Sequence, residues 1–266
     1  MVDGALGLIK NIQVKDTDSI YDVVEKRFGR DMAKYMVDSV TRGIFATSAR
    51  NLCIDNAFPA ISPLKSGRMV SNIWNVMREE RNRYPEMLPY KPHHVKKAEQ
   101  AGWKAWNLES GLESLIDKMS DKCVQNGVTI QCEASVDKIT KTDGNFIVND
   151  HVHNQLVSAI SAPNLSRILS DDFNPELLEN LAQYRETNLF VYLVELEEHE
   201  LPREVGFGVL TPSCEEPELL GITYDSCVFP EHDKRGSRYT IMSLGELDPQ
   251  QTLKRTLGIE SNIRYF

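Results

Sequence analysis

The stretch LESLIDKMSDKCVQNGVTI, residues 112–130, decides the predicted fold class because it places a helix directly before a strand. Its helical stripe consists of Leu112, Leu115, Ile116 and Met119. These residues recur at steps of three and four, which is the spacing of an amphipathic helix. Gly127 ends that pattern, and Val128 and Ile130 then alternate with polar residues as in a strand.

Strand patterns continue downstream. Asp143-Gly144 between two apolar runs is a strong hairpin signal. Further strands are predicted at residues 136–139, 146–148, 156–160, 189–196, 206–210, 219–224 and 239–244. Residues 248–266 are predicted to be helical.

Helical patterns dominate upstream. Apolar residues at three- and four-residue steps predict a helix over Ile20–Val40, with Asp18 and Ser19 at its capping positions. A second helix is predicted over Lys65–Tyr84. Helix-rich, mixed and strand-rich segments follow one another, so we expect an α+β fold with domains at 1–102, 103–165 and 166–266.

One stretch breaks these patterns. In SVTRGIFATSARNL, residues 39–52, Gly43 is expected to interrupt the helix, because glycine costs about 1 kcal/mol relative to alanine in a helix interior. The apolar pair Ile44-Phe45 follows, although a solvent-exposed loop would not need it. We therefore expect the backbone to approach a bulky apolar partner here, unless Gly43 is simply the glycine that caps the helix.

Composition and motifs exclude several classes of function. The net charge of −9 argues against binding the phosphate backbone of nucleic acid. Five scattered cysteines without a C-x-x-C pair suggest a reducing compartment, and no apolar run approaches the roughly 20 residues of a membrane-spanning helix. We expect no metal site and assign no catalytic residue, because no metal-ligand spacing, G-x-S-x-G turn or Cys/His nucleophile signature occurs.

The order of segments resembles a known family. WNLESGL (106–112), a helix, GVTI (127–130), a hairpin and VSAISAP (157–163) resemble the middle of flavin-containing amine oxidases. GFGVL (206–210), LGITYDS (220–226) and FPEHD (229–233) are most similar to the protoporphyrinogen oxidase family within that group. The resemblance implies a helical substrate- or membrane-facing subdomain at 1–102, the returning limb of an FAD domain at 103–165 and a β-rich substrate domain at 166–266.

The resemblance also implies site residues. It places Arg42, Gly43, Phe207, Leu210, Thr223 and Met242 at the substrate and Val136 at the nucleotide end of FAD. Gly43 would let the backbone approach the tetrapyrrole, whereas Arg42 would hold the loop or a buried partner. Phe207 and Leu210 would clamp a pyrrole ring. The alternative for these two residues is an ordinary place in the core of a sheet. For Met242, a place in the sheet core and a place at the substrate are equally open. Thr223 is more polar than the aliphatic residue expected at its position. Val136 is either a residue at the cofactor or an ordinary strand residue without a role in binding.

The implied activity is oxidation of protoporphyrinogen IX to protoporphyrin IX in haem biosynthesis, with FAD as cofactor and molecular oxygen as acceptor. Family likeness further implies a homodimer, peripheral on the mitochondrial inner membrane, with residues 20–84 facing the lipid. Two alternatives remain open: a catalytically dead tetrapyrrole-binding or partner module, and another amine-oxidase-like flavoenzyme such as a carotenoid desaturase.

The sequence departs from the family's pattern at its cofactor. No G-x-G-x-x-G turn, which cradles the FAD diphosphate, occurs in the chain. We therefore expect an internal fragment that lacks the N-terminal FAD fingerprint and the C-terminal FAD segment. Alone, it should bind FAD poorly and have little activity.

Overall fold

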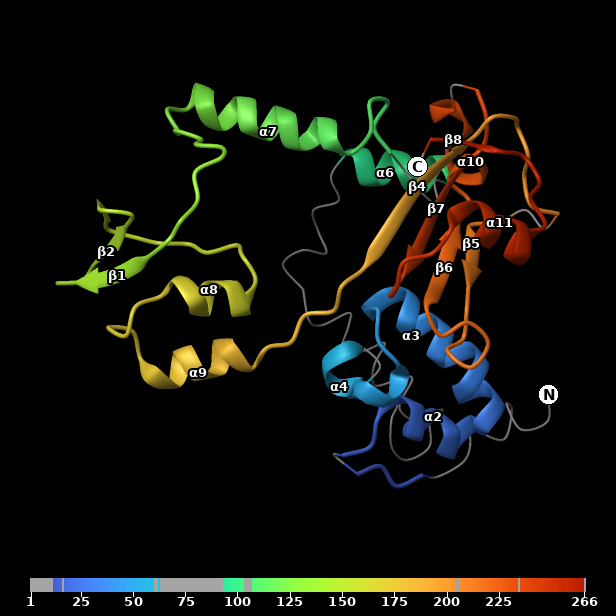
Figure 1. Cartoon of the computed structure of the whole chain (residues 1–266), viewed down its shortest axis with the longest axis horizontal. Coiled ribbons are helices and arrows are strands. Elements are labelled where there is room, and N and C mark those ends of the chain that lie inside the picture. The colour runs from blue at the N-terminus through green and yellow to red at the C-terminus, as the bar shows by residue number, and fades with distance from the viewer. Residues whose placement is uncertain are drawn as a thin grey trace. The chain divides into compact units, whose positions relative to one another are not determined.

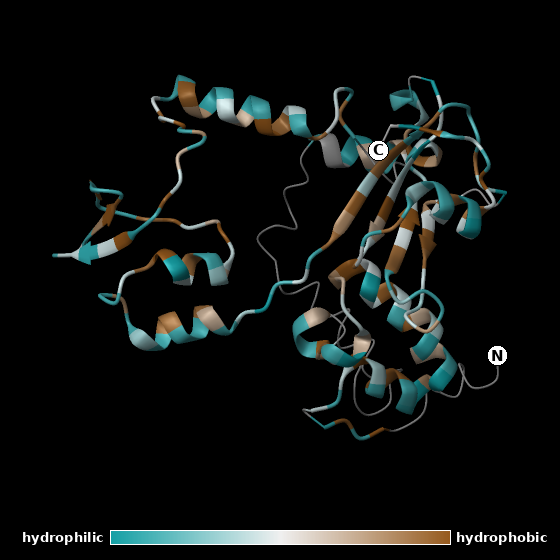
Figure 2. Cartoon of the chain, in the orientation of Figure 1, coloured by the Kyte–Doolittle hydropathy of each residue, from teal (hydrophilic) through white to brown (hydrophobic). Residues whose placement is uncertain are grey.

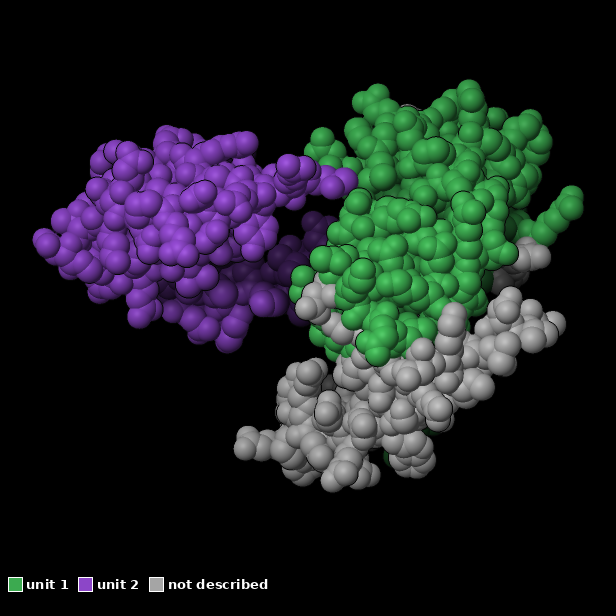
Figure 3. All heavy atoms as spheres, turned by 90° about the horizontal axis from the view of Figure 1, so that it is seen from below, with its two compact units in different colours: residues 1–109, 188–266 green, residues 110–187 purple. Residues whose placement is uncertain are grey.

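The computed structural model describes residues 12–15, 17–59, 62, 93–102, 107–203, 206–233 and 235–265. The chain forms two compact units, one of residues 1–109 and 188–266 and the other of residues 110–187 (Figure 3). Both contain helices and antiparallel strands, so the α+β class is confirmed. The domain boundaries and subdomain roles given above remain predictions, and the helix expected at Lys65–Tyr84 lies outside the described residues.

The helical layer of the first unit begins with α2 (Ile20–Phe28). Ser19 caps this helix through a capping box with Asp22, and Gly29 (φ 92°) ends it. The single helix predicted over Ile20–Val40 is therefore wrong, because the chain breaks at Gly29 and continues in two pieces. The further elements of this layer are η1 (Met32–Val37), α3 (Asp38–Phe45), η2 (Ala49–Asn51) and α4 (Ile54–Ala57). Helix α6 (His93–Ala101) also belongs to the first unit.

The helix α3 continues through Gly43, so the predicted interruption there is wrong. It ends two residues after the glycine, at Phe45, and Ala46 (φ 53°) takes the left-handed capping conformation. The alternative that Gly43 caps the helix is therefore also wrong. Gly43 lies inside α3, in a position that alanine would favour on helix propensity alone.

A five-stranded antiparallel sheet forms the other layer of the first unit, in the order β5-β6-β7-β4-β8 (Figure 1). Its strands are β4 (Phe190–Leu196), β5 (Gly208–Leu210), β6 (Leu219–Thr223), β7 (Arg238–Ser243) and β8 (Ile263–Tyr265). Three short helices lie between these strands in the chain: α10 (Asp225–Val228), η4 (Pro230–His232) and α11 (Pro249–Leu257). The first four strands match those predicted, whereas the residues after α11 form β8 instead of continuing as helix.

The two faces of this sheet differ because side chains alternate along each strand. On one face Ile222, Ile241 and Val194 form a buried core with Leu253 of α11. The register Leu210–Gly221–Met242–Val191 crosses the other face, as does Gly208–Thr223–Thr240–Leu193. Figure 2 shows hydrophobic residues along these strands. This second face carries three of the predicted substrate residues, Leu210, Thr223 and Met242.

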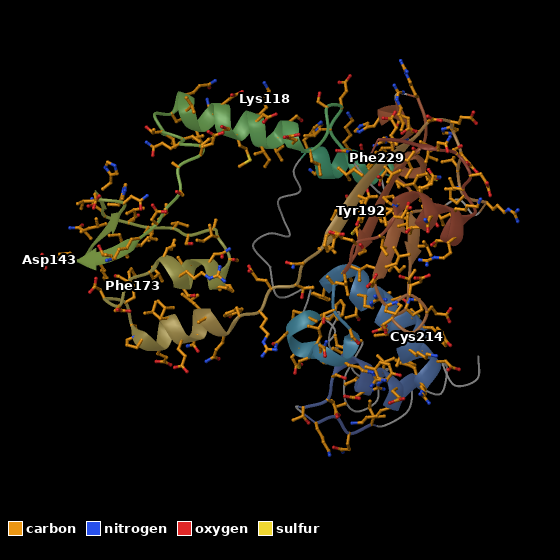
Figure 4. The ribbon with its side chains drawn as sticks, in the orientation of Figure 1. Lys118, Asp143, Phe173, Tyr192, Cys214 and Phe229 are labelled. Carbon is orange, nitrogen blue, oxygen red and sulfur yellow. The ribbon has the colours of Figure 1, made fainter. Side chains whose placement is uncertain are left out.

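The second unit contains α7 (Glu113–Gln125), β1 (Ile139–Thr142), β2 (Asn145–Val148), β3 (His151–His153), α8 (Ala162–Ile168) and α9 (Pro175–Gln183). Asp143 (φ 48°) and Gly144 (φ 82°) form the predicted two-residue hairpin turn, and Figure 4 shows Asp143 at its tip. The strands predicted at 128–130 and 156–160 are wrong, since neither segment pairs with a strand of the described chain.

Candidate functional site

A cavity of about 370 Å³ lies in the first unit, where α3 meets β5, β6 and β7. It is lined by Val40, Gly43, Ile44, Phe207, Gly208, Val209, Leu210, Leu220, Gly221, Ile222, Thr223 and Met242. Five of the six predicted substrate residues therefore lie together, although the helix and the strands are far apart in sequence. Their substrate roles remain predictions, but their meeting in one cavity is a finding of the structure.

Gly43 brings the backbone of α3 close to Leu210 of β5 in this cavity. A Cβ atom added to it would lie 2.6 Å from Cδ2 and 3.3 Å from Cδ1 of Leu210. Carbon atoms in contact prefer separations of about 3.5–4.0 Å, so Leu210 occupies the space that a side chain at position 43 would need. The bulky apolar partner expected from the sequence is therefore, within this chain, Leu210.

The rim of the cavity exposes large apolar side chains. Phe207 is 72% exposed, and Ile44 and Leu210 are exposed as well. Flat apolar ligands are bound largely by such aromatic and aliphatic faces. The lining is thus suited to an apolar ligand surface.

Thr223 is the polar residue that departed from the expected pattern. Its hydroxyl donates a hydrogen bond to Asp225 Oδ1 at 2.9 Å, and the hydroxyl of Thr240 donates to Asp225 Oδ2 at 2.7 Å. Because the hydroxyl is engaged by the carboxylate, the methyl group is the part of Thr223 left for the cavity. Threonine can in this way replace an aliphatic lining residue.

Arg42 does not line the cavity. The residue is 2% exposed, and its guanidinium donates to the backbone carbonyls of Thr211 (2.8 Å), Glu216 (3.0 Å) and Pro217. Burial lowers the pKa of Arg42, while the nearby Asp38 carboxylate opposes that effect. Arg42 is thus hydrogen-bonded to the loop between β5 and β6, and both its holding role and its contact with substrate stay predictions.

Sequence reasoning missed Asp38, which was counted as part of an amphipathic helix. Its carboxylate is buried and accepts hydrogen bonds from Ser213 N (2.9 Å), Ser48 Oγ (3.0 Å) and Ala49 N (3.4 Å). Burial alone would raise the pKa of Asp38, but these hydrogen bonds outweigh it and the pKa is lowered. The one available signal was its spacing of four residues from Arg42, which puts both on the same helix face.

Val136, the predicted cofactor residue, belongs to the second unit and lies outside any strand. It lines a hollow of about 480 Å³ that is mostly apolar, in which Arg167 donates to Asn164 at 3.0 Å. Such a surface fits an apolar part of a dinucleotide. The FAD diphosphate is held by several donors directed at its oxygens, whereas Arg167 is the one charged residue of this lining in the described chain. These residues therefore do not form a diphosphate site by themselves, and we derive no reaction step through the flavin from them.

Comparisons with known proteins agree with the resemblance found in the sequence. The chain is 30% identical over 241 residues to protoporphyrinogen oxidase of Bos taurus, covering 86% of this chain and 48% of the relative. It is 29% identical over 237 residues to the protein of that name from Homo sapiens, covering 85% and 47%. It is 25% identical over 248 residues to that from Dictyostelium discoideum, covering 82% and 46%. The chain spans about half the length of these relatives.

A solved structure from Exiguobacterium sp. 255-15, provisionally assigned as a protoporphyrinogen oxidase, aligns with a TM-score of 0.66. The alignment covers 99% of this chain and 57% of that one at 15% identity, so it supports the fold alone. No protein-family model matches the chain. The resemblance to the protoporphyrinogen oxidases that the sequence indicated is therefore confirmed, over a region equal to about half of those relatives.

Proposed function

We propose that this chain provides part of the substrate-binding surface of an oxygen-dependent protoporphyrinogen oxidase. The single observation that carries the proposal is the cavity, where α3 and the sheet bring together Gly43, Phe207, Leu210, Thr223 and Met242. The relatives named above make a tetrapyrrole the ligand to test first. The reaction would convert protoporphyrinogen IX to protoporphyrin IX in haem biosynthesis, with molecular oxygen as the final acceptor.

The contribution of this chain to such a reaction is binding and orientation. The cavity is at the small end of ligand pockets, which measure about 300–1,000 Å³. It therefore suits one pyrrole ring with its substituents, held between Phe207 and Leu210, better than a whole macrocycle. None of the residues that line it in the described part of the chain is titratable.

FAD is the cofactor that this proposal requires, and it would accept a hydride from the substrate when bound. Because the hollow beside Val136 does not form a diphosphate site by itself, we propose that this chain alone binds FAD weakly and has little activity. The same observation favours a second candidate function, a tetrapyrrole-binding module without catalysis.

Membrane association, a homodimer and the mitochondrial inner membrane also belong to the proposal. Within the described ranges, no helix has the length and apolar character needed to cross a bilayer.

The experiment that tests the proposal is a titration of the purified 266-residue chain with protoporphyrin IX, followed by porphyrin fluorescence. Losing a leucine-sized apolar contact costs about 1.5 kcal/mol, so Leu210→Ala should weaken binding by about tenfold. Leu115→Ala is the matched control, because Leu115 lies in the second unit and both leucines are 45% exposed. Equal effects of the two substitutions, or no binding by the unaltered chain, would refute the cavity as a tetrapyrrole site.

A parallel titration with FAD, and an assay of protoporphyrinogen turnover, separate the two candidate functions. Bound flavin with turnover supports the enzyme and contradicts our expectation that this chain alone is nearly inactive. Porphyrin binding without flavin supports the binding module for the chain as it stands.

A further inference from the structure

Two buried charged side chains of α3 face the loop that joins β5 to β6. Asp38 and Arg42 are 3% and 2% exposed, and their spacing of four residues places them on one side of the helix. The loop comprises residues 211–218, and Figure 4 marks it by Cys214. Burying charges is costly unless they are hydrogen-bonded, so the contacts of these two groups carry the argument.

Arg42 and Asp38 bind the loop at different points. Arg42 donates to three loop carbonyls, those of Thr211, Glu216 and Pro217, which brings both ends of the loop to one guanidinium. Asp38 accepts the N–H of Ser213 between them at 2.9 Å. The loop is therefore held at its two ends by a donor and near its middle by an acceptor.

The far side of Asp38 is also tied down. Its other oxygen accepts hydrogen bonds from Ser48 and Ala49, in the turn that follows α3. The end of α3, this turn and the β5–β6 loop therefore share one carboxylate. Such a network rigidifies the groups it joins when every member is satisfied.

The base of this loop is part of the cavity wall. Leu210 directly precedes Thr211, and Thr211 N donates to the carbonyl of Leu220 at 3.1 Å. Leu210 and Leu220 both line the cavity, and Gly43 directly follows Arg42 in the chain. Any shift of the loop relative to α3 therefore changes the gap between Leu210 and Gly43.

We propose that Asp38 and Arg42 are positioning residues that hold the β5–β6 loop against α3 and thereby fix the gap between Leu210 and Gly43, which sets the width of the cavity. The importance of that width for a tetrapyrrole rests on the proposed function. The clamp itself, meaning Asp38, Arg42 and the loop residues they bind, rests only on the contacts above.

If the clamp exists, the effects of two substitutions should depend on each other in a way that a general loss of protein stability would not produce. While the gap is fixed, Gly43→Ala must push Leu210 aside; once the loop is loosened, the added methyl group meets less resistance. Arg42→Lys loosens the loop, because one ammonium cannot reproduce the planar fork that reaches several carbonyls. The two substitutions should therefore be coupled, as residues acting through one contact usually are.

The test is a double-mutant cycle of Gly43→Ala and Arg42→Lys in the full 266-residue chain. Gly43→Ala should weaken protoporphyrin IX binding about tenfold in the unaltered chain but only about threefold or less beside Arg42→Lys, a coupling of about threefold. Urea midpoints of the same four proteins provide a readout without ligand, and Gly43→Ala should raise the midpoint more in the Arg42→Lys background. Hydrogen exchange at residues 211–217 should accelerate in Arg42→Lys and in Asp38→Asn.

Arg238→Lys is the matched control. Arg238 also binds a backbone carbonyl, that of Phe229 at 3.0 Å, together with Asp233 at 2.7 Å, but it does not line the cavity. Combined with Gly43→Ala, it should give additive effects. Additive effects with Arg42→Lys as well, together with unchanged exchange in the loop, would overturn the clamp.

The two proposals can fail separately. If the unaltered chain does not bind protoporphyrin IX, the proposed function fails, and the urea cycle and hydrogen exchange still decide the clamp. If binding is found but the cycle is additive, the clamp fails and the proposed function stands.

Discussion

Replacing Gly43 by alanine should change ligand binding far more than folding. Gly43 lies inside α3, where alanine gains about 1 kcal/mol of helix propensity over glycine. Against this gain stands the collision of the new Cβ with Leu210 Cδ2, at 2.6 Å in the present geometry. The atoms that must move are the far end of a half-exposed leucine, which can rotate toward solvent. We therefore expect the unfolding free energy to change by less than about 1 kcal/mol, the two effects being of similar size.

Binding should respond differently, because the displaced Leu210 is itself part of the cavity wall. A leucine moved out of contact with the ligand, or into its space, forfeits about 1.5 kcal/mol, which is roughly tenfold in affinity. The assay is a urea titration for stability beside a protoporphyrin IX titration for affinity. The control is Gly43→Ala combined with Leu210→Ala, which restores the room: its affinity should equal that of Leu210→Ala alone.

Two results would refute this reasoning. A loss of stability above about 3 kcal/mol would show that the glycine is needed for packing of the fold, as in substitutions that overpack a core. An unchanged affinity would show that the gap between α3 and Leu210 has no part in binding.

The remaining predictions concern neighbouring positions. Gly221→Ala should lower the unfolding free energy by about 2 kcal/mol or more in a urea titration, because its Cβ would lie 2.5 Å from the rigid backbone carbonyl of Val209. Thr223→Val should leave protoporphyrin affinity unchanged, since the methyl group remains, but should cost about 1 kcal/mol of stability through the lost hydrogen bond to Asp225. Asp38→Asn should lower the urea midpoint, and the difference in midpoint between this variant and the unaltered chain should become smaller as the pH falls. The lowered pKa of Asp38 contributes stability above its ordinary value of 3.8 that is lost as the pH drops through the folded-state pKa, so the urea midpoints should differ more at pH 7 than at pH 3.

Local signals predicted the strands that have partners nearby. The Asp143-Gly144 turn and the four strands from β4 to β7 followed from turn chemistry and alternation. Residues 128–130 and 156–160 carry equally good apolar patterns but form no strand. A β-favouring sequence becomes a strand only where a neighbour supplies hydrogen bonds and packing, and these segments have no such neighbour in the described chain.

The site could be predicted only in part. Gly43 and the Ile44-Phe45 pair stood out because they break the helix pattern, but nothing local says that their partner is Leu210, more than 160 residues later. The family resemblance placed both Gly43 and Leu210 at the substrate, and the fold shows that they meet each other. Asp38 gave one weak signal, its spacing of four residues from Arg42. A carboxylate on an amphipathic helix is normally solvated, and only the fold shows that the β5–β6 loop covers it.

The exceptions to local rules point to the same place in the molecule. A glycine inside a helix and a phenylalanine left 72% exposed are each unfavourable for an isolated chain, and Gly43 and Phe207 line the same cavity. Gly258 and Gly236 have reasons that concern the fold alone: Gly258 caps α11 in the left-handed conformation, and a Cβ at Gly236 would collide with the carbonyl of Leu196. Gly43 makes room for Leu210, which is itself a half-exposed part of the cavity wall. Proteins tend to keep local inconsistencies where function requires them. The coincidence of two such costs in one apolar cavity is therefore an argument for a ligand there that does not depend on the names of the relatives.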